Sequence, residues 1–211
     1  MMLPPGADKI ASAIGDGGPA KPDAGAGTSA TAPFPDSVRG HQEGETRAMK
    51  MKKSVELLNK AVADELHAVH QYMYFHFHLA DLGYMPLAGL LKRIAIEEMG
   101  HVEQLAERIL YLGGEVEMTV AAEVEKIHDP RKMLECARRM EAESAESYNQ
   151  WALECARNAD SVTKQLFETL VADEERHNDI FDQEVRRVEK FGEQYLALQS
   201  FDSNPQGGQP A

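Results

Sequence analysis

Hydrophobic residues recur every three or four positions along most of this chain, which is the period of an amphipathic α-helix. The predicted helical segments lie at about residues 54–80, 87–112, 130–159 and 161–191, with a short fifth one in EQYLALQ at 193–199. Ser54 and Asp129 stand where helix N-caps are expected, and Pro130 suits the first turn of the third segment. No segment alternates with the period of a strand, so the sequence predicts an all-α fold.

The connections between the four long segments are short, long and short. The long one, at residues 115–128, has about 14 residues and reaches ~45 Å when extended. A helix of about 26 residues is ~39 Å long, so this connection can run the full length of a bundle. Two antiparallel hairpins joined by a long crossover form a ferritin-like four-helix bundle, which is the fold that we predict, with a short C-terminal fifth helix.

The two ends of the chain differ in composition from its middle. Residues 1–48 contain six prolines and eight glycines and offer little hydrophobic surface, so we expect a disordered N-terminal extension. Residues 201–211 have a similar composition and are expected to form a flexible tail. The helical domain is therefore predicted to span residues 49–200.

Composition and charge exclude several classes of protein. The formal net charge of −13 argues against a nucleic-acid-binding surface, which needs clustered Lys and Arg. No hydrophobic run approaches the ~20 residues that span a membrane, and the N-terminus lacks the features of a secretory signal. We therefore expect a cytoplasmic protein that binds neither nucleic acid nor membrane.

The two cysteines, Cys136 and Cys155, lie on one predicted helix. At a rise of ~1.5 Å per residue, their spacing along that helix separates them by ~28 Å, whereas a disulfide needs Cα atoms within about 7 Å. Both are expected to be free thiols. The absence of a C-x-x-C pair also excludes a rubredoxin-type iron site and a zinc ribbon.

Two E-x-x-H motifs carry the candidate chemistry. IEEMGH at 96–101 contains Glu98 and His101, and DEERH at 173–177 contains Glu174 and His177. Positions i and i+3 of a helix share a face, so each motif projects a carboxylate and an imidazole in the same direction. A single pair of this kind is usually part of a solvated acidic surface, and only a larger pattern gives it meaning.

The larger pattern is a repeat between the two halves of the chain. The interval from Glu65 to Glu98 is identical to the interval from Glu141 to Glu174. Every candidate ligand in the first half therefore has an equivalent in the second half at one constant offset. Glu65 also falls on the hydrophobic stripe of its helix, where a carboxylate needs a cation or a hydrogen-bonding partner.

The six residues Glu65, Glu98, His101, Glu141, Glu174 and His177 suit a pair of divalent metal ions bridged by carboxylates. Carboxylate oxygen and imidazole nitrogen fit iron or manganese and are too hard for copper(I). The order of the motif excludes a mononuclear zinc protease site, which has H-E-x-x-H. The sequence thus predicts a dinuclear metal centre inside one subunit.

Three segments resemble bacterioferritin: LNKAVADELHAVHQY at 58–72, EEMGH, and DEERH followed by NDIFDQEV. The similarity covers residues 51–199. It implies that Glu65 and His101 are terminal ligands of one iron, that Glu141 and His177 serve the other, and that Glu98 and Glu174 bridge the two. Tyr72 matches a tyrosine near the di-iron site that can donate an electron.

The resemblance also implies a function. Bacterioferritins are ferroxidases, which oxidise Fe(II) with O₂ or peroxide and store ferric mineral inside a shell of 24 subunits built from two-fold dimers. A ferredoxin-type protein would supply electrons for iron release. Met99 matches the methionine that ligates haem b or a related porphyrin across the dimer interface. Without the resemblance, a methionine at this position would be interpreted as interface packing.

Four positions depart from the family pattern: Leu82 for a frequent Trp, Lys92 for a common Tyr, Gly100 for a common Lys or Arg, and Ile94 for a carboxylate near the iron site. The last change leaves all six ligands in place, but it removes a carboxylate from the expected route of iron into the cavity.

Two other functions fit the same ligands. A soluble di-metal oxidase or peroxidase would use them without forming a storage shell, and a helical scaffold would hold structural zinc. The four histidines of the first helix, His67, His70, His76 and His78, are interpreted as surface or interface residues, with a second metal site as the alternative.

Overall fold

The structure is a computed structural model that describes residues 36–201, with side chains from residue 49 onward. It contains the helices α1 (Asp36–Asp81), α2 (Met85–Tyr111), α3 (Pro130–Arg157), α4 (Ser161–Phe191) and α5 (Glu193–Leu198). The described residues include no strand, so the predicted all-α fold is confirmed. None of the described helices has a stretch apolar enough to span a membrane.

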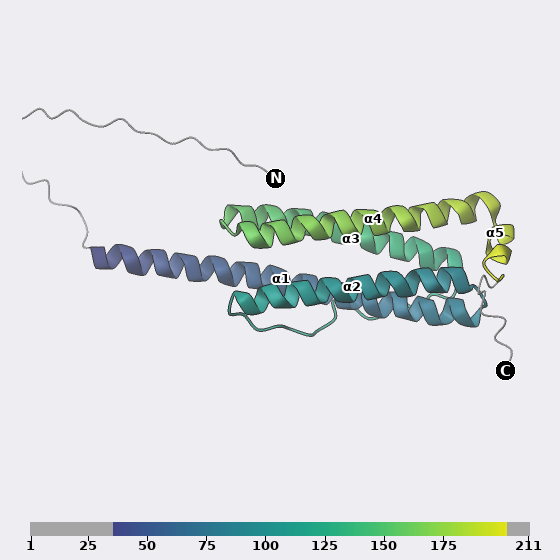
Figure 1. Cartoon of the computed structure of the whole chain (residues 1–211), viewed down its shortest axis with the longest axis horizontal. Helices are drawn as coiled ribbons and strands as arrows, with labels where there is room; N and C mark the ends of the chain where they lie inside the picture. The colour runs from purple at the N-terminus through teal and green to yellow at the C-terminus, as the bar shows by residue number, and fades with distance from the viewer. Residues whose placement is uncertain (1–35, 202–211) are drawn as a thin grey trace, which may run out of the picture.

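The long helices form two antiparallel hairpins, α1 with α2 and α3 with α4, which lie side by side along the bundle (Figure 1). The crossover between α2 and α3 runs along α1 and bonds to it. The Asn59 amide donates to the carbonyl of Glu115 over 2.9 Å and accepts from the backbone N–H of Glu117. Further along α1, the Gln71 amide donates to the carbonyl of Glu125 over 2.9 Å. The predicted lengthwise crossover is therefore confirmed.

Two consecutive glycines let the chain leave α2 and turn onto α1. Gly113 has φ = 76°, a conformation that residues with a Cβ rarely adopt. At Gly114, a Cβ atom would lie 2.6 Å from Cγ1 of Val55, so the backbone passes α1 at a distance that only glycine allows.

The start of α1 was predicted wrongly. We expected Ser54 to cap the helix, but α1 begins at Asp36, directly after Pro35. Ser54 lies inside the helix and is buried. Residues 45–53 are mostly helix-forming and contain neither proline nor glycine, so nothing in them ends the helix. The first turns project beyond the other helices (Figure 1). The rest of the expected extension, residues 1–35, and the tail from residue 202 lie outside the described residues.

The hydrophobic core consists of two clusters, one toward each end of the bundle. One cluster includes Tyr72, Phe75, Leu91, Leu134 and Phe181, and the other includes Leu58, Leu105, Tyr148, Phe167 and Leu170. On every long helix, the residues of the two clusters are separated by buried glutamate or histidine. α5 packs through Tyr195 and Leu196 against the first cluster and covers that end of the bundle.

Cys136 and Cys155 are both free and buried, as expected from their spacing on α3. Burial raises the pKa of each thiol to about 11. Both therefore remain protonated and unreactive at neutral pH.

Aspartates cap the two helices of the second hairpin. The Asp129 carboxylate accepts from the backbone N–H of Lys132 over 2.9 Å at the start of α3, as predicted. At the start of α4, Asp160 accepts from the backbone N–H of Thr163 over 3.2 Å and from its hydroxyl over 2.6 Å. Asp160 also pairs with Arg108 of α2 over 2.7 Å, and this contact joins the two hairpins.

Replacing Asp160 with alanine should lower the free energy of unfolding of the metal-free protein by about 2 kcal/mol. A lost N-cap costs about 1 kcal/mol, and the largely buried Arg108 guanidinium would also lose its carboxylate partner and keep only the Thr163 hydroxyl. Chemical denaturation followed by circular dichroism measures the change.

Asp129→Ala is the matched control, because it removes an N-cap that is exposed and bonds only to the backbone. We expect it to cost about 1 kcal/mol. Equal losses for the two variants would show that the Arg108 contact adds nothing to the cap.

Candidate metal centre

All four long helices contribute to a polar layer between the two hydrophobic clusters. α1 supplies Glu65, α2 supplies Glu98 and His101, α3 supplies Glu141, and α4 supplies Glu174 and His177. Each of the six side chains is buried, and Glu98 and His177 are fully so. The structure thus brings together all six residues predicted as ligands.

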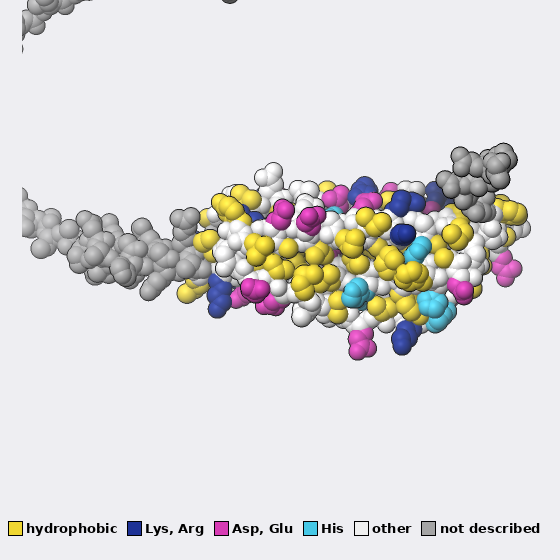
Figure 2. Space-filling view, turned by 60° about the horizontal axis from the view of Figure 1, so that its bottom comes forward, with side chains coloured by type: hydrophobic (Ala, Val, Ile, Leu, Met, Phe, Trp, Pro, Cys, Tyr) yellow, Lys and Arg dark blue, Asp and Glu magenta, His cyan; other side chains and the backbone are white. Residues whose placement is uncertain are grey.

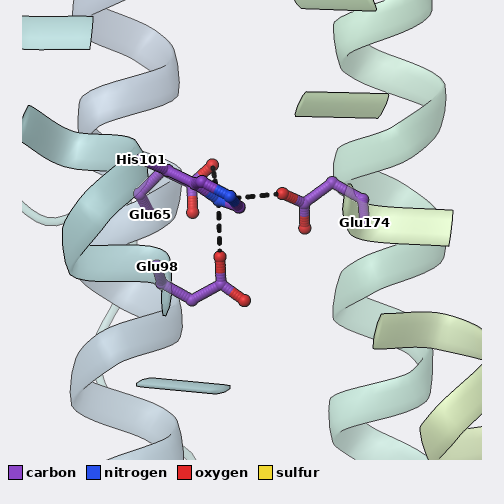
Figure 3. Close-up of side chains that lie close together, drawn as sticks. All are labelled: Glu65, Glu98, His101 and Glu174. Atoms are coloured by element: carbon purple, nitrogen blue, oxygen red, sulfur yellow. Dashed lines mark ion pairs between the residues drawn. The ribbon is translucent and has the colours of Figure 1, made fainter. Parts of the chain in front are cut away.

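His101 lies at the centre of the first group. Its Nδ1 atom is 2.8 Å from Glu98, 3.3 Å from Glu174 and 3.5 Å from Glu65 (Figure 3). The three carboxylates come from α2, α4 and α1, so one imidazole nitrogen faces acceptors from both hairpins.

His177 lies at the centre of the second group. Its Nδ1 atom is 2.9 Å from Glu98 and 3.6 Å from Glu141. Glu98 approaches His101 through Oε2 and His177 through Oε1, and therefore lies between the two groups. In each group, one ligand atom per residue falls within 4.8 Å of all the others, and Glu98 and Glu174 belong to both groups.

Several of these atoms face one another without a hydrogen bond. Both oxygens of Glu98, Oε1 of Glu174, and Nδ1 of both histidines are buried and have no hydrogen-bond partner. A buried polar atom without a partner costs free energy, and five in one layer indicate that something else satisfies them. Two divalent cations fit, because oxygen and nitrogen lone pairs converge on two positions with shared carboxylates between them.

The electrostatics agree with a site that is incomplete without cations. Burial raises the pKa of Glu65 and that of Glu141 well above the usual range for a carboxyl. Burial alone would raise the pKa of Glu98 too, but the two adjacent imidazoles lower it to about 2. Burial opposes protonation of His177, yet the Glu141 and Glu98 carboxylates outweigh it and raise its pKa to about 11. Protons therefore occupy the layer when metal does not.

Two tyrosines bond to the outer carboxylates of the layer. The Tyr72 hydroxyl donates to Glu141, and the Tyr148 hydroxyl donates to Glu65 over 2.7 Å. Burial raises the pKa of both phenols well above the usual range, so both are donors. Tyr72 was expected near the centre from the sequence, whereas Tyr148 was not. Tyr148 follows Tyr72 at the same offset that relates the ligands of the two halves, so the repeat could have found it.

A second set of residues that was not predicted lies on the outer side of the histidines. Glu97 accepts from Nε2 of His177 over 3.0 Å, and Asp173 lies 3.6 Å from Nε2 of His101. The Arg176 guanidinium contacts both of these carboxylates. Glu97 and Asp173 are also equivalent positions of the two halves, so the repeat could have indicated this pair as well.

Met99 and the histidines of α1 lie outside the metal centre. Met99 is 53% exposed on α2. His67 helps to line a separate pocket of about 250 Å³ between α1 and α3. His76 bonds to the carbonyl of Ala88, and His78 packs against His128 with ring centres 4.6 Å apart.

Comparison with protein families matches the Ferritin-like domain to residues 55–191. The chain is 38% identical to bacterioferritin from Desulfovibrio desulfuricans over 151 residues, which is 72% of this chain and 84% of that protein. It is 35% identical to bacterioferritin from Rhodobacter capsulatus over 147 residues, or 69% of this chain and 91% of that protein.

A solved structure supports the same relationship. The X-ray structure of the Desulfovibrio desulfuricans bacterioferritin, whose diiron site was studied in different catalytic states, matches with a TM-score of 0.73 and 35% sequence identity. The match covers 78% of this chain and 97% of that one. On the fold, the buried ligand layer and these relatives, the chain belongs to the bacterioferritin family of ferritin-like proteins.

Proposed function

We propose that this protein is a ferroxidase that detoxifies and stores iron. It takes up Fe(II) in pairs at the buried layer, oxidises it with O₂ or peroxide, and passes ferric iron to a mineral core. The observation that carries this proposal is the set of buried, unpartnered oxygen and nitrogen atoms that converge on two positions. The diiron site named for the Desulfovibrio relative supports iron as the metal.

The two positions would divide the ligands equally. Glu65 and His101 hold one Fe(II), Glu141 and His177 hold the other, and Glu98 and Glu174 bridge them. Carboxylate ligands stabilise Fe(III) relative to Fe(II), so the ligand set favours oxidation of its substrate. The paired irons supply the electrons that reduce the oxidant.

Other residues of the layer hold these ligands in place. The hydroxyls of Tyr72 and Tyr148 fix the orientations of Glu141 and Glu65. We also assign Tyr72 the role of an electron donor to the centre, since it lies in the buried layer and contacts a ligand directly. The hydrophobic clusters on both sides keep bulk water from the reaction.

Storage requires a closed assembly, for which we propose 24 subunits arranged as two-fold dimers in the cytoplasm. Hydrophobic side chains collect on one face of the molecule, on the side of the α1–α2 hairpin (Figure 2). Such an exposed surface is typical of an interface between subunits. Release of stored iron would draw electrons from a ferredoxin-type partner.

We further propose that Met99 binds haem between two subunits. It is exposed on α2, as are Ile96 and Met85, so it is available to an interface rather than to the buried centre. A two-fold axis would bring two Met99 side chains to one haem iron. Thioether ligands favour Fe(II) and raise the reduction potential, which suits electron transfer for iron release.

Glu98→Ala and His177→Ala should each lower the initial rate of Fe(II) oxidation by more than about 100-fold. Loss of a residue that only supports a ligand already costs about 10- to 100-fold, and these variants remove a bridge and a terminal ligand. Oxygen consumption after anaerobic Fe(II) loading measures the rate.

The control is Glu103→Ala, which removes an exposed carboxylate of α2 outside the layer and should leave the rate unchanged. Oxidised iron should then elute with the protein at the mass of a large shell. Wild-type rates in the double variant Glu98→Ala/His177→Ala would refute the assignment. Rapid oxidation by a monomer or dimer that retains no mineral would favour a soluble di-metal oxidase.

Met99→Leu should remove the Soret band of protein expressed with ample haem, while the initial rate of Fe(II) oxidation stays within about twofold. The Met99 side chain is exposed, whereas Glu98 and His101 are buried in the centre, so the two activities should separate. Absorption spectra of the purified variants measure the effect. A wild-type protein that remains colourless under these conditions would leave Met99 as interface packing.

A further inference from the structure

We propose that Glu97 is a positioning residue for the ligand His177, and that Arg176 makes the two metal positions unequal by holding Glu97 against His177 while it bonds Asp173 away from His101. In this proposal, the position beside His177 binds a divalent cation more tightly than the position beside His101. The inference rests on the dinuclear centre proposed above and adds an order of loading to it.

The histidines can bind metal only in one tautomer. In both rings, Nδ1 faces the buried carboxylates and Nε2 faces outward. A neutral imidazole that binds a cation through Nδ1 must carry its proton on Nε2, and an acceptor next to Nε2 favours that form. A carboxylate at Nε2 therefore prepares the ring for metal before any metal arrives.

His177 has such an acceptor at full hydrogen-bond strength. Its Nε2 lies 3.0 Å from Oε2 of Glu97, across the boundary between α4 and α2. Glu97 is itself held by Arg176, whose Nη2 lies 2.7 Å from the same oxygen. One carboxylate oxygen of Glu97 therefore faces both the imidazole of His177 and the guanidinium of Arg176.

His101 is held less firmly. Its Nε2 lies 3.6 Å from Asp173, which is beyond hydrogen-bond distance. Asp173 instead bonds to Arg176, one turn further along α4, over 3.1 Å. The single guanidinium thus fixes Glu97 against His177 and draws Asp173 toward itself rather than toward His101.

The internal repeat shows why the two sides differ. Glu97 and Asp173 are equivalent positions, as are His101 and His177, but the equivalent of Arg176 is Gly100. α2 therefore offers no second guanidinium at this position that could hold Asp173 against His101. The two metal positions therefore differ because of one position of the repeat, which is Arg176 in α4 and Gly100 in α2.

Co(II) titration of the metal-free protein without oxygen tests the proposal, with visible absorption and bound metal as readouts. Wild type should bind two Co(II) per subunit in two steps of different affinity. His177→Ala should remove the tighter step and His101→Ala the weaker one, which assigns each step to a side.

Glu97→Ala should then weaken the tighter step by about 10- to 100-fold and leave the weaker step within about threefold. Arg176→Gln should weaken the tighter step in the same direction, and Arg176→Lys should restore part of the loss. The matched control, Glu175→Ala, removes an exposed carboxylate from the same turn of α4 and should change neither step.

Three results would overturn the proposal: two equal steps in wild type, an unchanged tighter step in Glu97→Ala, or an equal loss in Glu175→Ala. In each of these the dinuclear centre itself would stand. Failure of the wild-type protein to bind Co(II) at all would overturn both the dinuclear centre and the unequal affinities of its two positions. Failure of the proposed function is therefore distinguishable from failure of this inference alone.

Discussion

Four carboxylates and two imidazoles lie in the interior of this bundle, where an isolated charge costs several kcal/mol. The six side chains lie at one level of the four long helices, and they divide the hydrophobic core into two clusters. Protons on the layer offset part of it in the metal-free protein, because Glu65 and Glu141 are held protonated by burial. Divalent cations would offset far more, and the helices, the crossover and the two clusters place the ligands where two cations can do so.

The internal repeat explains how two hairpins can build one centre. Each tyrosine of the layer donates to a carboxylate of the other hairpin, from Tyr72 to Glu141 and from Tyr148 to Glu65. Glu98 likewise reaches His177 across the same boundary. The hairpins are thus joined by polar contacts at the level where hydrophobic packing between them is interrupted. The crossover makes this arrangement possible, because it carries the chain from the end of α2 along the bundle to its opposite end. From that end α3 runs beside α1 (Figure 1).

Much of this could be predicted from the sequence, because periodicity and spacing are local. The four helices, the crossover and the closeness of the six ligands all follow from residue types at fixed intervals. The start of α1 does not follow from such intervals. Ser54 suits an N-cap and a helix interior equally well, and only the structure of the preceding residues decides between the two. Tyr148 and Glu97 were missed for another reason. The repeat marks Tyr148 as the equivalent of Tyr72 and Glu97 as the equivalent of Asp173, but which atoms these side chains contact across the boundary between hairpins cannot be deduced from spacing alone.

The buried layer is, in our interpretation, a site for two metal ions within one subunit. Anomalous X-ray diffraction from crystals of the protein loaded with Fe(II) in the absence of oxygen tests this claim most directly. We predict two peaks roughly 3.5–4 Å apart, one beside Glu65 and His101 and the other beside Glu141 and His177, with Glu98 and Glu174 between them. A layer without a peak, its histidines and carboxylates bonded only to one another, would contradict the claim.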